Sequence, residues 1–299
     1  MPAIRHGDPH PGTRSEGQSR MIELDEVSVA YRVRGGSLRA LEAASAVFPA
    51  GSLTALIGPS GCGKTSLVAA MAGLLEPESG RIAVDGVELS GVRPRTAVIF
   101  QDGGLLPWKT VRANAELPLL LRGLPARERR QKVDPILEEL GLLDFASFHP
   151  ARLSGGMRQR LGVARALACE PDLLLMDEPF SSLDALTREA LQDGLLDVRR
   201  RHDVTMILVT HSIEEAAYLA DRVYVFAGKA PGRIAGLVEW AGPGGAAARG
   251  PGFRASDAYF ARCAKLRSAF EAAVAAGDTA RDTARAAARN AAGAAGGGA

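Results

Sequence analysis

A glycine-rich segment of the chain has the composition of a loop that binds phosphate groups. It reads Gly58-Pro-Ser-Gly-Cys-Gly-Lys-Thr65. Glycines let the backbone curl without a Cβ in the way, so that successive N–H groups point at one centre. In such a loop the lysine reaches the β- and γ-phosphates of a nucleotide, and the threonine hydroxyl holds Mg²⁺. We expect the phosphates to be bound by Gly58, Pro59, Ser60, Gly61, Cys62, Gly63, Lys64, Thr65 and Ser66, with Lys64 also acting in catalysis.

The flanks of this loop predict a strand before it and a helix after it. Leu53–Ile57 is a short apolar run, and Leu67, Val68 and Met71 follow with helical spacing. A strand, a glycine-rich loop and a helix in this order are the context that the motif requires. The helix N-terminus adds partial positive charge, which favours phosphate. This placement disfavours the alternative, a glycine-rich turn after a buried strand.

A second chemical feature is a pair of carboxylates at the end of an apolar run. Leu173–Asp177 is continuously apolar up to its last residue, as in a strand buried on both faces, and Glu178 follows. Adjacent strand residues point to opposite faces, so the two carboxylates can have different roles. We expect Asp177 to support Mg²⁺ and Glu178 to polarise the attacking water. An Asp-Glu pair by itself usually opens a helix or turn, but the strand end favours catalysis.

One histidine ends a further apolar run, Thr205–Thr210. His211 would reach the same crevice as the carboxylates if both runs are parallel strands, because ligands bind at the carboxyl ends of such strands. A histidine at a strand end is otherwise more often structural. Phosphoryl transfer needs mainly positioning and neutralisation of negative charge, which Lys64, Mg²⁺ and backbone amides supply. We therefore expect Glu178, His211 and Lys64 to be the catalytic residues.

Taken together, these segments resemble the ABC-type ATPases. The resemblance covers about residues 21–234 and rests on five features in the family's order and spacing: the glycine-rich loop, Leu153-Ser-Gly-Gly156, Leu175-Met-Asp-Glu-Pro179, Ser182-Leu-Asp184 and His211. It implies that Gln101 touches Mg²⁺ and senses the γ-phosphate, and that Tyr31 stacks on adenine. For Tyr31, an ordinary half-buried strand tyrosine is the competing interpretation. The metal ligands expected on this basis are Thr65, Gln101 and Asp177.

The same resemblance implies that two copies of the chain bind ATP between them. Ser154, Gly155 and Gly156 precede a helical pattern, so they would form a helix N-terminus, which attracts phosphate. In the family this phosphate belongs to the ATP bound by the other subunit. Asp184 would belong to a loop that crosses the dimer interface. ATP then joins two copies, and hydrolysis releases them.

A finer resemblance links the chain to the nitrate/sulfonate/taurine branch of bacterial importers. It rests on Gln101–Trp108, Phe180–Arg188, Thr210–Ala216 and Pro231–Ile234. The branch commonly has Gly-Ala-Leu-Asp where this chain has Ser181-Ser182-Leu183-Asp184. The resemblance implies a small, often anionic solute, a solute-binding protein and membrane permease subunits, with this chain peripheral on the cytoplasmic face of the inner membrane. Leu105–Trp108 is the candidate permease contact, with a locally buried tryptophan as the alternative.

Composition limits the other functions. The chain has 299 residues, 36 basic and 34 acidic, and this near-balance gives no electrostatic case for a nucleic-acid partner. The three cysteines lie far apart and form no metal-binding spacing. No segment reaches the roughly 20 apolar residues of a membrane-spanning helix, and the first residues lack an apolar signal core. We expect a protein of the reducing cytoplasm, attached to a membrane through a partner.

The alternation of apolar strands and helical segments predicts an α/β fold with a parallel sheet covered on both faces. The resemblance implies that this is a P-loop NTPase (RecA-like) core with an antiparallel β subdomain and an inserted helical subdomain. We expect a disordered tail at 1–20 and a nucleotide-binding domain at 21–238, with the helical subdomain at about 102–165. Residues 239–299 would comprise a Gly/Ala/Pro linker, an amphipathic helix near 256–276 that packs on the core, and a frayed low-complexity tail.

The leading hypothesis is therefore the ATP-hydrolysing subunit of a bacterial importer. A soluble ABC-type ATPase acting on DNA or ribosomes usually carries two nucleotide domains or a long coiled-coil insertion, and this sequence has neither. A non-catalytic scaffold is disfavoured because every catalytic position is filled. The nucleotide subunit of an exporter is disfavoured only by resemblance, through Leu105–Trp108 and Pro231–Ile234.

Overall fold

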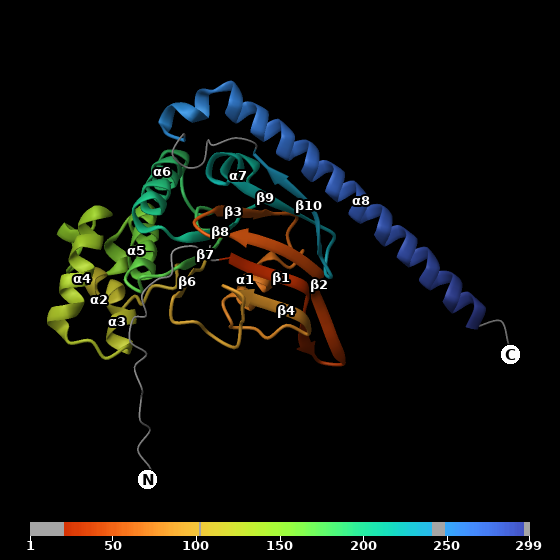
Figure 1. The fold of residues 1–299 in the computed structure, drawn as a ribbon, viewed down its shortest axis with the longest axis horizontal. Helices are drawn as coiled ribbons and strands as arrows, with labels where there is room; N and C mark the ends of the chain where they lie inside the picture. The colour runs from red at the N-terminus through yellow and green to blue at the C-terminus, as the bar shows by residue number, and fades with distance from the viewer. Residues whose placement is uncertain (1–20, 102, 241–248, 296–299) are drawn as a thin grey trace, which may run out of the picture.

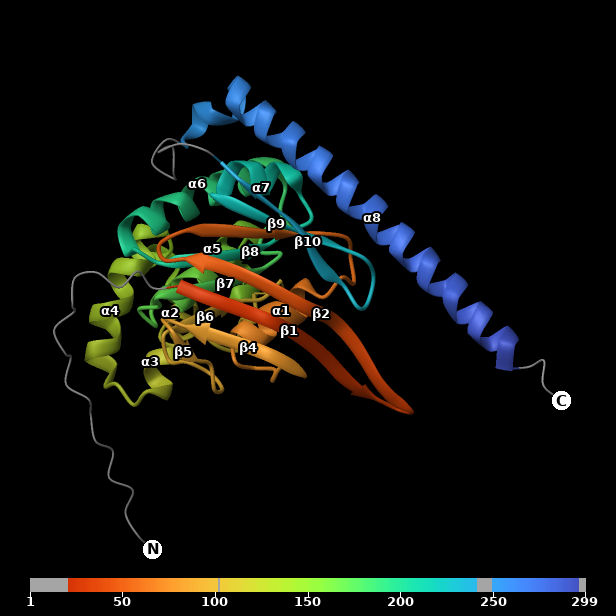
Figure 2. The ribbon, with the colours of Figure 1, turned by 45° about the vertical axis from the view of Figure 1, so that its right-hand side comes forward.

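The computed structural model describes residues 21–101, 103–240 and 249–295. Within them the chain forms two sheets and two groups of helices (Figures 1 and 2). The tail expected at 1–20 lies outside the described residues, as does most of the expected linker.

The larger sheet has six strands in the order β10-β9-β3-β8-β7-β6. Its strands are β3 (Leu53–Ile57), β6 (Thr96–Ile99), β7 (Leu173–Asp177), β8 (Thr205–Val209), β9 (Arg222–Ala227) and β10 (Arg233–Glu239). All neighbours pair in parallel except β10, which runs antiparallel to β9. Strand β3, which precedes the glycine-rich loop, therefore lies between β8 and β9, at the centre of a parallel sheet.

The smaller sheet is antiparallel, with the order β2-β1-β4-β5. Its strands are β1 (Met21–Val33), β2 (Gly36–Pro49), β4 (Ser79–Val84) and β5 (Val87–Glu88). It lies across the parallel sheet from helices α6 (Ala185–His202) and α7 (Ile213–Leu219), as both views show (Figures 1 and 2). Helix α1 (Lys64–Met71) lies between the two sheets.

Side-chain alternation along the buried strands divides the core into two apolar clusters. In β8, Met206 and Leu208 join the cluster that contains residues of α6 and α7, whereas Ile207 and Val209 join the cluster that contains α1 and the antiparallel sheet. A strand buried on both faces needs apolar residues at every position, which explains the continuous apolar runs in the sequence.

The helical subdomain has its own apolar cluster. Its helices are α2 (Val111–Ala115), α3 (Leu117–Leu121), α4 (Ala126–Glu139) and α5 (Gly155–Leu167). Helix α5 contacts α2 and α4 on one side and α6 and β6 on the other, so it joins this subdomain to the core. The family fold expected from the sequence, with its core, β subdomain and helical insertion, is confirmed by the solved structures described below.

The C-terminal region differs from the expectation in two ways. Helix α8 (Asp257–Ala295) continues well beyond residue 276, where a frayed tail was expected, because alanine and arginine have high helix propensity. Its C-terminal part extends past the body of the molecule (Figures 1 and 2). The first part packs back on the core, with Leu266 and Ala273 buried.

The second difference lies in the segment interpreted as a linker. Arg249 is fully buried, forms an ion pair with Asp221, and donates hydrogen bonds to the carbonyls of Tyr218 and Ala220. The end of this segment is therefore anchored on the core. Composition gave no signal for it, because a single arginine among glycines and alanines reads as solvent-exposed.

Candidate nucleotide-binding site

The glycine-rich loop connects β3 to α1 through backbone that only glycine accommodates. Gly63 has φ of 89°, and a Cβ there would lie 2.5 Å from the carbonyl oxygen of Ala40. A Cβ on Gly58 would lie 2.7 Å from Cβ of Phe226. The loop is thus pressed against both sheets, and its shape is fixed by close packing as well as by its own sequence.

Lys64 is buried at the first position of α1. Its Nζ donates to the carbonyl oxygens of Gly58 at 2.8 Å and Pro59 at 3.0 Å, and lies 3.6 Å from Sγ of Cys62. Burial raises the pKa of the Cys62 thiol, so the sulfur stays protonated. The loop therefore surrounds a single cation, whose charge is available to a phosphate at this position.

Thr65 and Asp177 come together next to this lysine. The pKa of Asp177 is raised, mainly because the carboxylate is buried and also because Glu178 lies nearby. A hydrogen bond from Thr65 and the positive charge of Lys64 offset part of this rise. Gln101, which follows β6 at the same edge of the sheet, is exposed. A hydroxyl, a carboxylate and an amide are oxygen ligands of the kind that Mg²⁺ takes, so these residue types fit a magnesium ion.

Glu178 and His211 face each other across neighbouring strands. Asp177 pairs with Val209 in the parallel register of β7 and β8, and the N–H of Glu178 donates to the carbonyl oxygen of Val209 at 3.0 Å. His211 Nδ1 then lies 3.4 Å from Oε2 of Glu178. Glu178 has φ of 48°, a strained value for a non-glycine residue, of the kind that concentrates at functional sites. Both side chains remain partly exposed, so a water molecule can reach them.

Tyr31 lies beside the start of α1. Its hydroxyl donates to Oγ of Ser66 at 3.0 Å, and the residue is 40% exposed. Strand β1 thus places a half-exposed aromatic ring next to the phosphate loop. The hydrogen bond accounts for the hydroxyl, while the exposed part of the ring is free to contact a base.

The remaining predicted residues form a separate group on α5 and α6. Ser154 is the N-cap of α5 and accepts a hydrogen bond from the N–H of Met157 at 3.2 Å. Asp184 is the N-cap of α6, and its carboxylate accepts a hydrogen bond from the N–H of Thr187 at 3.0 Å. This hydrogen bond lowers the pKa of Asp184. A Cβ on Gly156 would lie 2.4 Å from Cγ2 of Thr187, so the two helix starts are in close contact.

The structure therefore divides the predicted residues into two groups. The first comprises the glycine-rich loop, Tyr31, Asp177, Glu178 and His211 around the ends of the parallel strands. The second comprises Ser154, Gly155, Gly156 and Asp184. Helix α1 packs on β1, β2 and β7, whereas α5 packs on α2, α4, α6 and β6.

The sequence patterns did not predict the hydrogen bonds that hold the turn carrying His211. Thr210 is buried, and its hydroxyl donates to Oε2 of Glu215 at 2.5 Å. The same hydroxyl accepts from the N–H of Ser212 at 3.1 Å, which fixes the turn that carries His211. A hydroxyl residue at the end of an otherwise apolar strand was the available signal.

Comparisons with known proteins show the family of the chain. The family model described as "ABC transporter" matches residues 41–181. The taurine import ATP-binding protein TauB of Pseudomonas aeruginosa is 43% identical over 213 residues, which are 71% of this chain and 81% of the relative. An ATP-binding protein of Brucella abortus is 46% identical over 202 residues, 68% of this chain and 77% of the relative.

Solved structures of ABC transporter cassettes share the fold of this chain. The dimeric bacterial ABC transporter cassette MJ0796 has a TM-score of 0.66 at 27% identity, covering 74% of this chain and 99% of that one, and has also been solved bound to ADP and Pi. CbiO1 of Clostridium perfringens, part of the ABC transporter complex cbiONQ, has a TM-score of 0.64 at 27% identity, covering 72% of this chain and 87% of that one.

The chain therefore belongs to the ATP-binding proteins of ABC transporters, which bind and hydrolyse ATP. This confirms the family and the enzymatic activity expected from the sequence. No helix in the described part of the chain combines the length and hydropathy needed to cross a membrane.

Proposed function

We propose that this chain powers the uptake of a small anionic solute of the sulfonate type, by hydrolysing ATP between two of its copies. The similarity to taurine import proteins over most of the chain carries the transport direction and the solute class. The geometry of the loop, the strand ends and the two helix starts supports the mechanism, which is argued below.

The glycine-rich loop and Lys64 bind the triphosphate of the chain's own nucleotide. The N-terminus of α1 has no side-chain cap, so its N–H groups remain for phosphate oxygens. Tyr31 contacts the adenine. Thr65, Gln101 and Asp177 hold Mg²⁺, which neutralises charge on the β- and γ-phosphates when it is bound.

Glu178 orients the attacking water and accepts its proton, and His211 stabilises that arrangement from 3.4 Å away. A carboxylate beside a histidine at the open end of a parallel sheet can hold a water molecule in line with the γ-phosphate. Lys64 compensates the negative charge that spreads over the phosphoryl oxygens during the reaction.

The second group of residues caps the nucleotide of the partner copy. Ser154 and the N–H groups of Gly155 and Gly156 form a helix start without a lysine of its own, at which Ser154 is exposed and Gly156 is buried. Gly156 contacts α6, whose N-cap is Asp184. The dimeric state of MJ0796 supports this arrangement. Hydrolysis removes the γ-phosphate that both copies contact, and the dimer then opens.

Contact with the permease is made by Leu105–Trp108. Trp108 is 71% exposed, which contradicts the alternative of a locally buried tryptophan. The segment follows Gln101 closely, so a docked membrane protein could respond to the nucleotide. Through this contact the chain is held at the cytoplasmic face of the inner membrane, and the solute-binding protein acts on the permease.

Reconstitution tests the proposal. The chain would be incorporated into liposomes with the permease and the solute-binding protein that co-purify with it, and ATP turnover would be measured with and without taurine. We expect solute-stimulated turnover and uptake of labelled taurine, and neither with Glu178→Gln. Stimulation by other anionic solutes but not taurine would revise the solute. Export of solute in the same vesicles would overturn the proposed direction.

A further inference from the structure

Arg188 lies in the first turn of α6, shortly after Asp184, the N-cap of that helix. Its Nη2 donates a hydrogen bond to the carbonyl oxygen of Leu183 at 2.7 Å. Its Nε lies 3.7 Å from Oε1 of Glu215 on α7. The side chain of Arg188 therefore contacts the segment that leads into α6 and also a helix that begins next to His211.

Glu215 is a buried carboxylate, only 8% exposed. Such a charge is costly in a protein interior unless hydrogen bonds and an opposite charge accompany it. Burial raises the pKa of Glu215, while the hydrogen bond from Thr210 and the charge of Arg188 favour the ionised form. Nε of Arg188 is buried without a hydrogen-bond acceptor among the described residues, so the nearby carboxylate compensates its positive charge. Each of the two charged groups therefore holds the other in place.

The contacts of Glu215 continue into the turn that carries His211. Thr210 donates to Oε2 of Glu215 at 2.5 Å and accepts the N–H of Ser212 at 3.1 Å, so both neighbours of His211 are held. Ser212 in turn caps α7 by accepting the N–H of Glu215 at 3.1 Å. Glu215 thereby supports the turn from which His211 approaches Glu178 to 3.4 Å.

The first turn of α6 also touches the start of α5. A Cβ on Gly156 would lie 2.4 Å from Cγ2 of Thr187, the residue before Arg188. Leu183, whose carbonyl oxygen accepts the hydrogen bond from Arg188, is itself buried in the apolar core. Arg188 thus lies between the second group of predicted residues and the support of the His211 turn.

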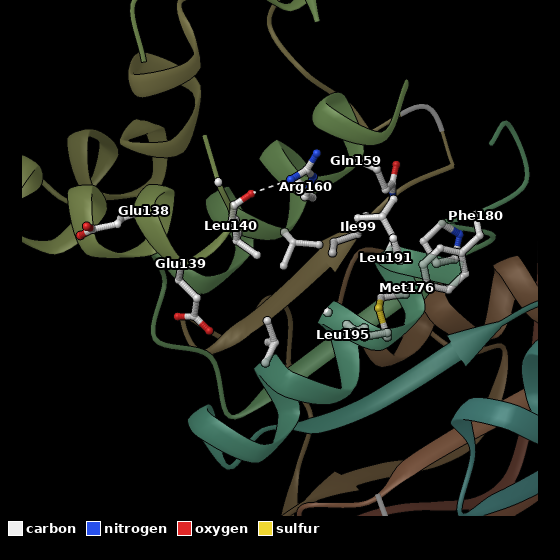
Figure 3. Close-up of a pocket in the computed structure, with 16 residues that line it drawn as sticks. Ile99, Glu138, Glu139, Leu140, Gln159, Arg160, Met176, Phe180, Leu191 and Leu195 are labelled. Carbon is white, nitrogen blue, oxygen red and sulfur yellow. Dashed lines mark hydrogen bonds between the residues drawn. The ribbon is translucent and has the colours of Figure 1, made fainter. Parts of the chain in front are cut away.

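The middle of α6 offers less support to this arrangement. A cavity of about 340 Å³ lies beside Gln159, between the helical subdomain and the core (Figure 3). Leu191, Gly194 and Leu195 of α6 line it. Side chains that face an open space forfeit the contacts that would hold them. The position of the start of α6 therefore depends more on the contacts of its own first turn, and those of Arg188 are polar and directional.

We propose that Arg188 is a positioning residue for ATP hydrolysis, which joins the helix start at Asp184 to the turn that carries His211. It holds the carbonyl oxygen of Leu183 by a hydrogen bond and pairs with the Glu215 carboxylate. The group that faces the partner's nucleotide and the group around the chain's own nucleotide are thus connected within one chain, an inference that rests on the roles proposed above for Asp184 and His211.

A variant of this arginine should slow the reaction without weakening ATP binding. Arg188→Met keeps an extended side chain but removes its charge and its donors. We expect turnover, at saturating ATP and saturating chain concentration, to fall by about 10- to 100-fold because the His211 turn is displaced. Affinity in a fluorescent-ATP titration should stay unchanged. Arg200→Met is the matched control and should retain turnover, because Arg200 pairs with Asp197 near the other end of the same helix.

A double-mutant cycle tests whether the loss passes through His211. In a His211→Ala background, Arg188→Met should lower turnover further by no more than about twofold, since the residue that it positions is gone. Losses that multiply in full would overturn the proposal. Full turnover in His211→Ala by itself would instead contradict the proposed function, and the position of the turn, measured as follows, would then decide the role of Arg188.

That position is measured without reference to turnover, through the ring C–H signal of His211 in a carbon-13 NMR spectrum of the full chain. The signal is assigned by its absence in His211→Ala. It should shift in Arg188→Met and stay in place in Arg200→Met. It should also shift in Arg188→Lys, which keeps the charge but lacks the planar set of donors that reaches both partners. An unchanged signal in either folded variant of Arg188 overturns the proposal, and Arg188→Lys decides it if Arg188→Met does not fold.

Discussion

Two helices of this protein begin at positions suited to phosphate, but they begin differently. Helix α1 follows Gly63, which has a left-handed backbone and no side chain to cap the helix. Helix α5 follows Ser154, whose hydroxyl caps the N–H of Met157. The first N–H groups of α1 therefore remain available to a ligand, whereas one of the first N–H groups of α5 is already paired with the Ser154 hydroxyl.

The charges around the two helix starts differ as well. Lys64 is held inside the first loop by the carbonyls of Gly58 and Pro59. At the second, Arg158 donates to the carbonyl oxygen of Leu153 at 2.7 Å and is directed to the backbone. The first is thus equipped to hold a triphosphate within one chain. The second offers a few exposed groups, which suits a cap on a phosphate that another copy holds.

The largest change in ATP turnover is expected from a variant of Glu178, which should also trap the dimer in which both helix starts contact ATP. Glu178→Gln should reduce ATP turnover by about 10²- to 10⁴-fold, because the water loses its general base. ATP binding should persist, so an ATP-dependent dimer should accumulate, measurable by light scattering after size exclusion. Adding Ser154→Arg to this variant should prevent the dimer. A monomer with full turnover would contradict the role assigned to Glu178.

A smaller loss is expected when the second helix start alone is changed. Ser154→Arg should lower turnover by about 100-fold, since it displaces the groups that cap the partner's phosphate. Nucleotide affinity of the single chain should stay unchanged in a fluorescent-ATP titration. Weakened binding by the isolated chain would show that Ser154 acts on the chain's own nucleotide.

A change at the start of α1 should instead weaken the binding of the chain's own nucleotide. Lys64→Ala should weaken ATP binding by about 10- to 100-fold, because charge-assisted hydrogen bonds to the phosphates are lost. Lys64→Arg serves as a control that keeps the charge but changes the geometry. Unchanged affinity in Lys64→Ala would remove this residue from the site.

The smallest effect concerns the contact between α5 and α6. Gly156→Ala would place a Cβ 2.4 Å from Thr187, and we expect it to destabilise the protein by about 1–3 kcal/mol through overpacking. Gly155→Ala is the matched control, because its Cβ would lie 3.3 Å from the flexible end of Leu183. Urea unfolding of both variants measures the difference. Equal stabilities would show that this contact is not tight.

Much of this site could be predicted because its parts are local. Gly58–Ser66 forms one continuous loop, and the residue types alone specify curled backbone, cation and hydroxyl. The apolar run before Asp177 predicts a strand whose end carries carboxylates. These inferences need only the chain's own spacing, which secondary structure converts directly into position.

Other features depend on contacts between distant segments. The 3.4 Å approach of His211 to Glu178 follows from the register of β7 and β8, which periodicity does not specify. Arg249 is buried because Asp221 and two carbonyls meet it, a feature invisible in a glycine- and alanine-rich segment. The cavity beside Gln159 exists only where two subdomains face each other.

The sequence by itself determined the family, the position of the glycine-rich loop between a strand and a helix, and the strand ends that carry the catalytic candidates. Each of these rests on residues a few positions apart, and the short-range geometry of strands, turns and helices is nearly the same in every protein. Only the tertiary structure decided the distance between Glu178 and His211, the burial of Arg249 and the close contact between the starts of α5 and α6. Pairing and packing between distant segments depend on the shape of the whole core, which no local pattern encodes.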